Sequence, residues 1–192
     1  MKTDILQKSF KDSSLNTYAI SLHFPPDVNQ MISSAVKSIA VATGNSFILE
    51  KNIPPHITLG AFHASKNDES KLISIVEEFS KNQKTGAIQF KEIGNFKKKV
   101  LFLKPEKNAF LSQINSELHL LMLSEFEKAE NGYYLPENWL PHTTLATRLN
   151  QNLFGKAFRI AEQIRLPLET CANEIAVYKC SPFKELKKFM LV

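Results

Sequence analysis

The amino-acid sequence predicts an α+β fold built from two related halves. Segments with the apolar pattern of a strand alternate along the chain with segments that have the apolar pattern of a helix, which is typical of a mixed α and β protein. The pentad Pro-His-x-Thr-Leu occurs twice, at 55–59 and 141–145, in a chain with only five histidines. Each copy is followed by an amphipathic helical pattern and then by more strand. We therefore predict a duplicated unit whose equivalent strands meet across a central cleft.

The first half is predicted to alternate strands and helices. Residues 17–24 alternate loosely and end at two prolines, which indicates a strand. Apolar residues recur at helical spacing from 27 to about 41, and Gly44 is a typical stop signal. Residues 46–50 are predicted to form a short strand, and 56–63 a strand that carries the first pentad.

The remaining elements follow from the same patterns. An acidic start and apolar residues at helical spacing predict a helix over 68–82. The further predicted elements are strands 87–93 and 99–103, a long helix 108–127, a strand 142–147 with the second pentad, a helix 153–164, and strands 174–180 and 185–192.

Size and composition fit one large globular domain. The 192 residues are 43% hydrophobic and 22% charged, which is enough to build a core. No apolar run reaches the ~18 residues of a membrane span. We expect residues 1–16 to be a polar leader, without the apolar centre of a signal peptide, and 17–192 to be a single bilobal domain. Cys171 and Cys180 show no metal-binding spacing, so free thiols and a cytoplasmic location are expected.

The charge pattern permits an anionic partner without requiring one. The formal charge is +5, and the chain has only three arginines. A mildly basic protein attracts polyanions, but the lysine runs at 97–99 and 187–188 are predicted to be solvated surface. Since arginine-rich tracts and zinc-finger spacing are lacking, sequence-specific DNA binding is not indicated.

Each pentad places a histidine and a threonine side chain on one face of a predicted strand. Residues i and i+2 of a strand point the same way, so His56 lies beside Thr58 and His142 beside Thr144. Imidazole titrates near pH ~6.5, so one ring can act as general base and the other as general acid. The threonine hydroxyls would donate to phosphate oxygens that gain negative charge. This arrangement favours phosphodiester chemistry and requires no metal, since no carboxylate or cysteine completes a zinc site.

A single histidine on a strand is usually structural, whereas two in matched pentads favour a functional role. His23 and His119 have no such context, and we interpret both as structural or surface residues. His63 ends the first motif strand but has no threonine partner, so it is left out of the predicted site.

The two pentads resemble the signature of the two-histidine (2H) phosphoesterases. This superfamily includes the RNA 2′,3′-cyclic phosphodiesterases, historically called 2′-5′ RNA ligases, and the resemblance extends from about Thr17 to Pro182. It implies two pseudo-symmetric lobes, each with an antiparallel sheet and flanking helices, and an active site in the cleft between them. It also implies hydrolysis of a 2′,3′-cyclic phosphate or a 2′-5′ linkage in RNA or a nucleotide, without a cofactor, and with ligation as the reverse reaction.

The chain departs from this family pattern at one position. An arginine often follows the second motif histidine by five residues, but here Thr147 occupies that position and Arg148 comes next. Strict alternation would put Arg148 on the face of His142, so Arg148 is a candidate phosphate ligand. Tyr133 and Tyr134 are candidates for stacking on a base.

The sequence alone leaves two alternatives to an enzyme open. The first is a non-catalytic module of the same fold that binds a nucleotide or RNA, and the second is a protein-interaction scaffold with a vestigial cleft. Because both histidines and both threonines are intact, we favour the enzyme, acting as a monomer.

Overall fold

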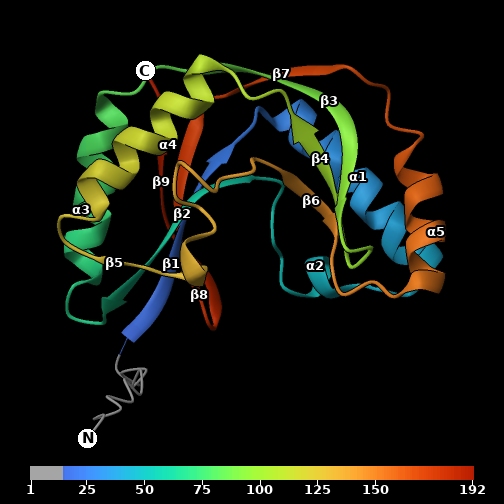
Figure 1. Cartoon of the computed structure of the whole chain (residues 1–192), viewed down its shortest axis with the longest axis horizontal. Helices are drawn as coiled ribbons and strands as arrows, with labels where there is room; N and C mark the ends of the chain where they lie inside the picture. Colours follow the sequence, from blue (N-terminus) through green and yellow to red (C-terminus); the bar gives the residue numbers. More distant parts are fainter. Residues whose placement is uncertain (1–14) are drawn as a thin grey trace, which may run out of the picture.

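The computed structural model describes residues 15–192, which form two antiparallel sheets side by side with helices on their outer faces (Figure 1). The predicted α+β class and the antiparallel sheet in each lobe are confirmed. The first strand begins at Leu15, two residues earlier than predicted. The rest of the predicted polar leader lies outside the described residues.

The first sheet contains the first pentad. Its strand order is β5-β2-β1-β8-β9, and all of its pairs are antiparallel. The central strand β1 is flanked by β2, which follows the motif residue His56, and by β8. The strands are β1 (Leu15–His23), β2 (Ile57–Ser65), β5 (Glu127–Lys128), β8 (Glu174–Cys180) and β9 (Phe183–Met190).

The second sheet contains the second pentad. Its strand order is β6-β4-β3-β7, again antiparallel throughout. The motif strand β6 lies at the edge of this sheet, whereas β2 is an inner strand of the first. The strands are β3 (Gly86–Phe96), β4 (Val100–Pro105), β6 (Thr143–Ala146) and β7 (Leu168–Ala172).

Two helices pack on the lobe opposite to the one that contains the strand preceding them in the chain. The helix α1 (Pro26–Thr43) follows β1 but packs on β6 and on α5 (Gln151–Ala161) of the second lobe. Conversely, α4 (Ala109–Met122) follows β4 but packs on β2, beside α3 (Glu69–Lys81). Figure 1 shows α3 and α4 at one end of the molecule, with α1 and α5 at the other. Each lobe is therefore assembled from distant parts of the chain.

Several elements differ from the sequence-based prediction. Residues 46–50 are helical, as α2 (Phe47–Glu50), because the Glu50 amide donates to the Ser46 carbonyl (2.8 Å) in a helical turn. So short an apolar run does not distinguish helix from strand. The predicted helix 108–127 ends at Met122, because Glu127–Lys128 instead pair with β2 as β5. Strand β7 was not predicted, because its register with β3 is a long-range contact.

The hydrophobic core is continuous across both lobes. It contains Tyr18 and Ile20 of β1, Phe90 of β3, Leu103 of β4 and Trp139. Across the described chain, the helices are too short or too polar for any of them to span a membrane.

Candidate active site

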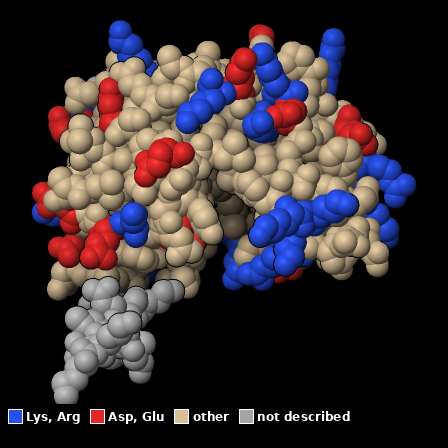
Figure 2. Space-filling model, viewed as in Figure 1, with Lys and Arg blue, Asp and Glu red and all other residues tan. Residues whose placement is uncertain are grey.

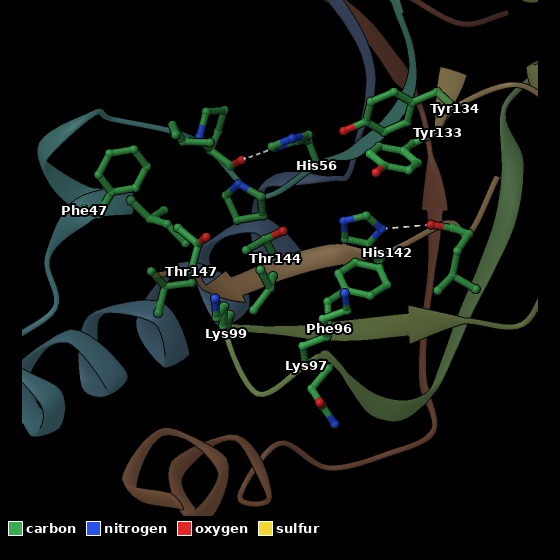
Figure 3. Close-up of a pocket in the computed structure, with 18 of the residues that line it drawn as sticks. Phe47, His56, Phe96, Lys97, Lys99, Tyr133, Tyr134, His142, Thr144 and Thr147 are labelled. Atoms are coloured by element: carbon green, nitrogen blue, oxygen red, sulfur yellow. Dashed lines mark hydrogen bonds between the residues drawn. The ribbon is translucent and has the colours of Figure 1, made fainter. Parts of the chain in front are cut away.

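A cavity of about 850 Å³ opens between the two sheets, and both pentads contribute to its wall. His56 comes from the segment before β2, and His142 from the segment before β6. Thr144, Tyr133 and Tyr134 line the same space (Figure 3). The structure therefore brings together residues that are widely separated in sequence.

Strand alternation places the motif side chains as expected. Ile57 and Leu59 are buried in the core, whereas His56 and Thr58 are only partly buried, and the second pentad repeats this pattern. Both motif strands also carry an irregularity at the pentad leucine. Thr58 pairs with Ser21 and Gly60 with Ile20, so Leu59 has no partner on β1. Leu145 is bypassed on β4 in the same way. Bulges commonly reorient side chains next to functional sites.

Each motif histidine is anchored by the carbonyl group two residues before it. The Nδ1 of His56 lies 2.7 Å from the Pro54 carbonyl oxygen, and the Nδ1 of His142 lies 2.8 Å from that of Leu140. Since a carbonyl oxygen only accepts, both rings carry a proton on Nδ1. This tautomer leaves both Nε2 atoms available to exchange a proton with a ligand.

Burial lowers the pKa of both motif histidines. Desolvation dominates for His56, and the neighbouring His142 lowers its pKa further, while the Pro54 carbonyl opposes the shift. Desolvation also lowers the pKa of His142, against the opposing effect of the Leu140 carbonyl. Both imidazoles are therefore held towards the neutral form in the free protein.

Aromatic rings support both imidazoles. Phe96 meets the His142 ring edge-on, with ring centroids 5.1 Å apart, and the Phe102 ring lies 5.0 Å from it. The ring of His23 lies 6.1 Å from that of His56. Gly94 provides space for Phe102, since an added Cβ would lie 2.2 Å from that ring.

The two motif threonines differ in their surroundings. Thr144 lines the cavity, whereas Thr58 is not part of its wall. Burial raises the pKa of Tyr134, and the nearby Thr58 side chain opposes this shift. The Thr58 carbonyl accepts a hydrogen bond from Trp139 Nε1 (2.9 Å). Tyr134, unlike Thr58, is part of the cavity wall.

Arg148 lies outside the cavity wall. Strand β6 ends at Ala146, and Arg148 adopts a left-handed backbone conformation (φ 58°). The alternation that would have put its side chain beside His142 therefore does not continue to this residue. Its guanidinium instead lies 3.7 Å from the centroid of the Phe47 ring, and it is Phe47 and Thr147 that line the cavity.

Several cavity residues were missed by the sequence analysis. Lys97 and Lys99, predicted to be plain surface, lie at the turn between β3 and β4 and line the cavity while remaining exposed. Figure 2 shows basic side chains gathered on one rim of the central hollow. The described part of the chain contributes no acidic side chain to the cavity wall. Phe47 and Phe96 were also missed, since no local pattern indicates that α2 and this turn meet the motifs.

Within residues 15–192, no group of three or more His, Cys, Asp or Glu side chains is arranged to hold a metal ion. Cys171 and Cys180 are both free thiols, as predicted.

Comparison with known sequences identifies one family. The family model described as the 2′-5′ RNA ligase superfamily matches residues 26–181, which include both pentads. No protein with a curated description matches the chain.

Solved structures share the fold at low sequence identity. LigT of E. coli, in complex with 3′-AMP, is 14% identical, with a TM-score of 0.61 over 93% of this chain and 99% of LigT. TT0787 of Thermus thermophilus is 17% identical, with a TM-score of 0.59 over 91% of this chain and 97% of TT0787. A structure described as a phosphoesterase is 15% identical, with a TM-score of 0.60 over 92% and 98% of the two chains.

Proposed function

Because the chain belongs to the 2′-5′ RNA ligase superfamily, we propose that it is a metal-independent phosphodiesterase. Its substrates would be 2′,3′-cyclic phosphates, or 2′-5′ linkages, of RNA or nucleotides, and ligation would be the reverse reaction. The catalytic residues would be His56 and His142.

One observation carries this proposal, namely the matched anchoring of the two imidazoles. Each ring is bonded through Nδ1 to the carbonyl two residues earlier, and each lines the same cavity. An Nδ1-anchored imidazole has a single nitrogen, Nε2, with which to take or give a proton. Two such groups in one cavity supply the base and the acid that phosphodiester cleavage needs.

In the proposed reaction, the neutral imidazole of one histidine removes a proton from water through Nε2. The water oxygen attacks phosphorus and forms a new P–O bond, while the bond to one ribose oxygen breaks. The protonated Nε2 of the other histidine gives its proton to that oxygen. The site ends with the two protonation states exchanged, and protons return to their starting positions through solvent.

The charge that develops on the non-bridging oxygens would be stabilised by groups around the cavity. Thr144 can donate its hydroxyl hydrogen, and Lys97 and Lys99 add positive charge. Donors and cations placed where charge develops lower the barrier. Tyr133, which is exposed beside the motifs, and the more buried Tyr134 offer rings for a base or ribose. The E. coli LigT structures contain 3′-AMP and ATP, which supports a nucleotide ligand here.

The test is turnover of nucleoside 2′,3′-cyclic monophosphates and 2′-5′-linked dinucleotides in EDTA. We expect His56→Ala and His142→Ala each to lower kcat by at least ~10²-fold, because each removes one proton-transfer group. His63→Ala is the matched control, since His63 lies on β2, the strand that follows His56, and outside the cavity wall. The product, a 2′- or 3′-phosphate, identifies the bond that is cut.

Turnover near the wild-type rate in both alanine variants would refute the mechanism. No turnover by the wild type, together with measurable nucleotide binding, would instead identify a non-catalytic binding module of the same fold.

A further inference from the structure

A buried asparagine on α4 contacts the first motif strand and the cavity wall at the same time. Asn115 is 1% exposed and lies on the face of α4 that packs on β2. Its side-chain amide nitrogen lies 2.7 Å from the Leu59 carbonyl oxygen and 3.1 Å from the Tyr134 carbonyl oxygen. Carbonyl oxygens only accept, so the amide donates one hydrogen to each. Asn115 therefore joins the first pentad to the segment 129–140, which contains Tyr134 and leads into the second pentad.

Leu59 requires a side-chain donor because of its position on β2. It lies at the bulge, so it has no pairing partner on β1, and on the other side β5 pairs with Phe62 and His63. A buried carbonyl group without a donor is costly, and Asn115 supplies the donor that a neighbouring strand would otherwise give. The irregularity at the pentad leucine is thus completed by a residue of α4.

Two further hydrogen bonds attach the segment 129–140 to β2, one on each side of the Asn115 contact. The Ala129 amide donates to the Ala61 carbonyl (2.8 Å). At the other end, Trp139 Nε1 donates to the Thr58 carbonyl. Together, these bonds connect the strand that follows one motif histidine to the residues that precede the other.

We propose that Asn115 is a positioning residue for the two-histidine site. It holds the Leu59 and Tyr134 carbonyls at a fixed separation. The first belongs to the pentad of His56 and the second to the segment that leads to His142, so the contact fixes the two imidazoles relative to each other. This inference rests on the proposed function, because that reaction needs both imidazoles at one phosphate.

Asn115→Leu removes both donated hydrogens with little change in side-chain volume. We expect kcat to fall roughly tenfold, since small displacements of a reacting group are costly. KM should remain unchanged, because Thr144, Lys97 and Lys99 belong to the second lobe and keep their positions.

Asn115→Ser is a second variant, chosen to preserve folding. Its hydroxyl can bond to the carbonyl one turn earlier in α4, and its smaller volume leaves room for water beside the two freed carbonyls. The fold is then kept without the fixed link, and we expect kcat to fall ~3-fold or more for the same reason as in Asn115→Leu.

Asn29→Leu is the matched control. The side-chain amide nitrogen of Asn29 also donates to a carbonyl, that of Phe24 (2.7 Å), and neither residue lines the cavity. This variant should lower Tm while leaving kcat unchanged. Equal losses of kcat in Asn29→Leu and Asn115→Leu would overturn the proposal, as would a wild-type kcat in either folded Asn115 variant.

The indole proton of Trp139 provides a readout that does not depend on turnover, because the chain has one tryptophan. Its NMR signal reports the bond from Nε1 to the Thr58 carbonyl. We expect this proton to exchange with solvent at least ~10-fold faster in both Asn115 variants, since exchange follows local opening, and at the wild-type rate in Asn29→Leu.

The exchange rate also separates this inference from the proposed function. Unchanged exchange in both folded Asn115 variants would overturn the positioning role, whatever the activity of the wild type. If the wild type turns over none of the tested substrates, the proposed function fails, and the exchange rate still decides whether Asn115 holds the segment against β2.

Discussion

At the scale of single residues, the site depends on two imidazoles that are held neutral by burial. The pentads predicted that His56 and His142 share a site with Thr58 and Thr144, since alternation along a strand is a local property. The cavity wall includes all of these residues except Thr58. The position of Thr58 was harder to foresee, since its side chain lies near Tyr134, which is 76 residues further along the chain. Local patterns contain no information about such a contact.

The lowered pKa values of these histidines should set the pH dependence of the proposed reaction. Both pKa values lie below the ordinary 6.5, so at pH 7 the free protein has two bases and little acid. As the pH falls, one ring gains the proton that the reaction needs. We expect a bell-shaped profile of kcat/KM with its maximum below pH ~6.5, since kcat/KM reports the free enzyme.

A bound phosphate anion stabilises the imidazolium form, so the profile of kcat should have its maximum at a higher pH than that of kcat/KM. Initial rates between pH 4.5 and 8.5 measure both profiles. A maximum of kcat/KM above pH 7 would contradict this expectation.

At the scale of elements, the hairpin formed by β3 and β4 supplies the lysines of the cavity wall. Its turn, closed by the bond from the Lys99 amide to the Phe96 carbonyl (2.8 Å), brings two lysines to the cavity. The sequence predicted both strands but assigned these lysines to plain surface. Their location depends on the pairing of β4 with β6, which joins segments some 40 residues apart and leaves no trace in either segment alone.

The hairpin lysines should contribute to substrate binding through charge. Within residues 15–192, neither Lys97 nor Lys99 forms an ion pair, so their charges are available to a phosphate. We expect Lys97→Gln and Lys99→Gln each to raise KM ~3-fold with kcat within twofold, as is typical of exposed charge pairs. The salt dependence of KM should weaken in both variants.

Lys98→Gln is the control, because Lys98 lies in the same turn but not in the cavity wall. An equal rise in KM for Lys98→Gln would mean that only net charge matters.

At the scale of the whole molecule, the two lobes are interlocked rather than merely adjacent. The duplicated order of elements was correctly predicted, but the crossing of α1 and α4 to opposite lobes was not. Apolar periodicity shows that a helix buries one face, and it does not show which sheet covers that face. Neither lobe is built from a contiguous half of the chain, so neither can complete its core alone.

This interlocking should make unfolding a single cooperative event. Trp139, 5% exposed, precedes the second pentad and donates to the carbonyl of Thr58 in the first. Trp139→Phe keeps an aromatic ring but leaves that carbonyl without its donor, at a cost of about 1–2 kcal/mol in the free energy of unfolding. In urea, we expect a lower midpoint and still one transition, by tyrosine fluorescence and circular dichroism alike. Tyr133→Phe, a change at an exposed ring, is the control and should leave the midpoint of the urea transition unchanged. Two separate unfolding transitions in either variant would argue against interlocked lobes.

Because the two motif threonines have different surroundings, the two pentads do not form a symmetric site. A site with a true two-fold axis would bind a phosphodiester group in two opposite senses with the same energy, and one sense would leave the wrong ribose oxygen beside the acid. Here Thr144 lines the cavity, whereas Thr58 is not part of its wall. If the proposed function is correct, the two orientations should therefore differ in energy, and the duplicated motif should bind the phosphodiester group in one preferred orientation.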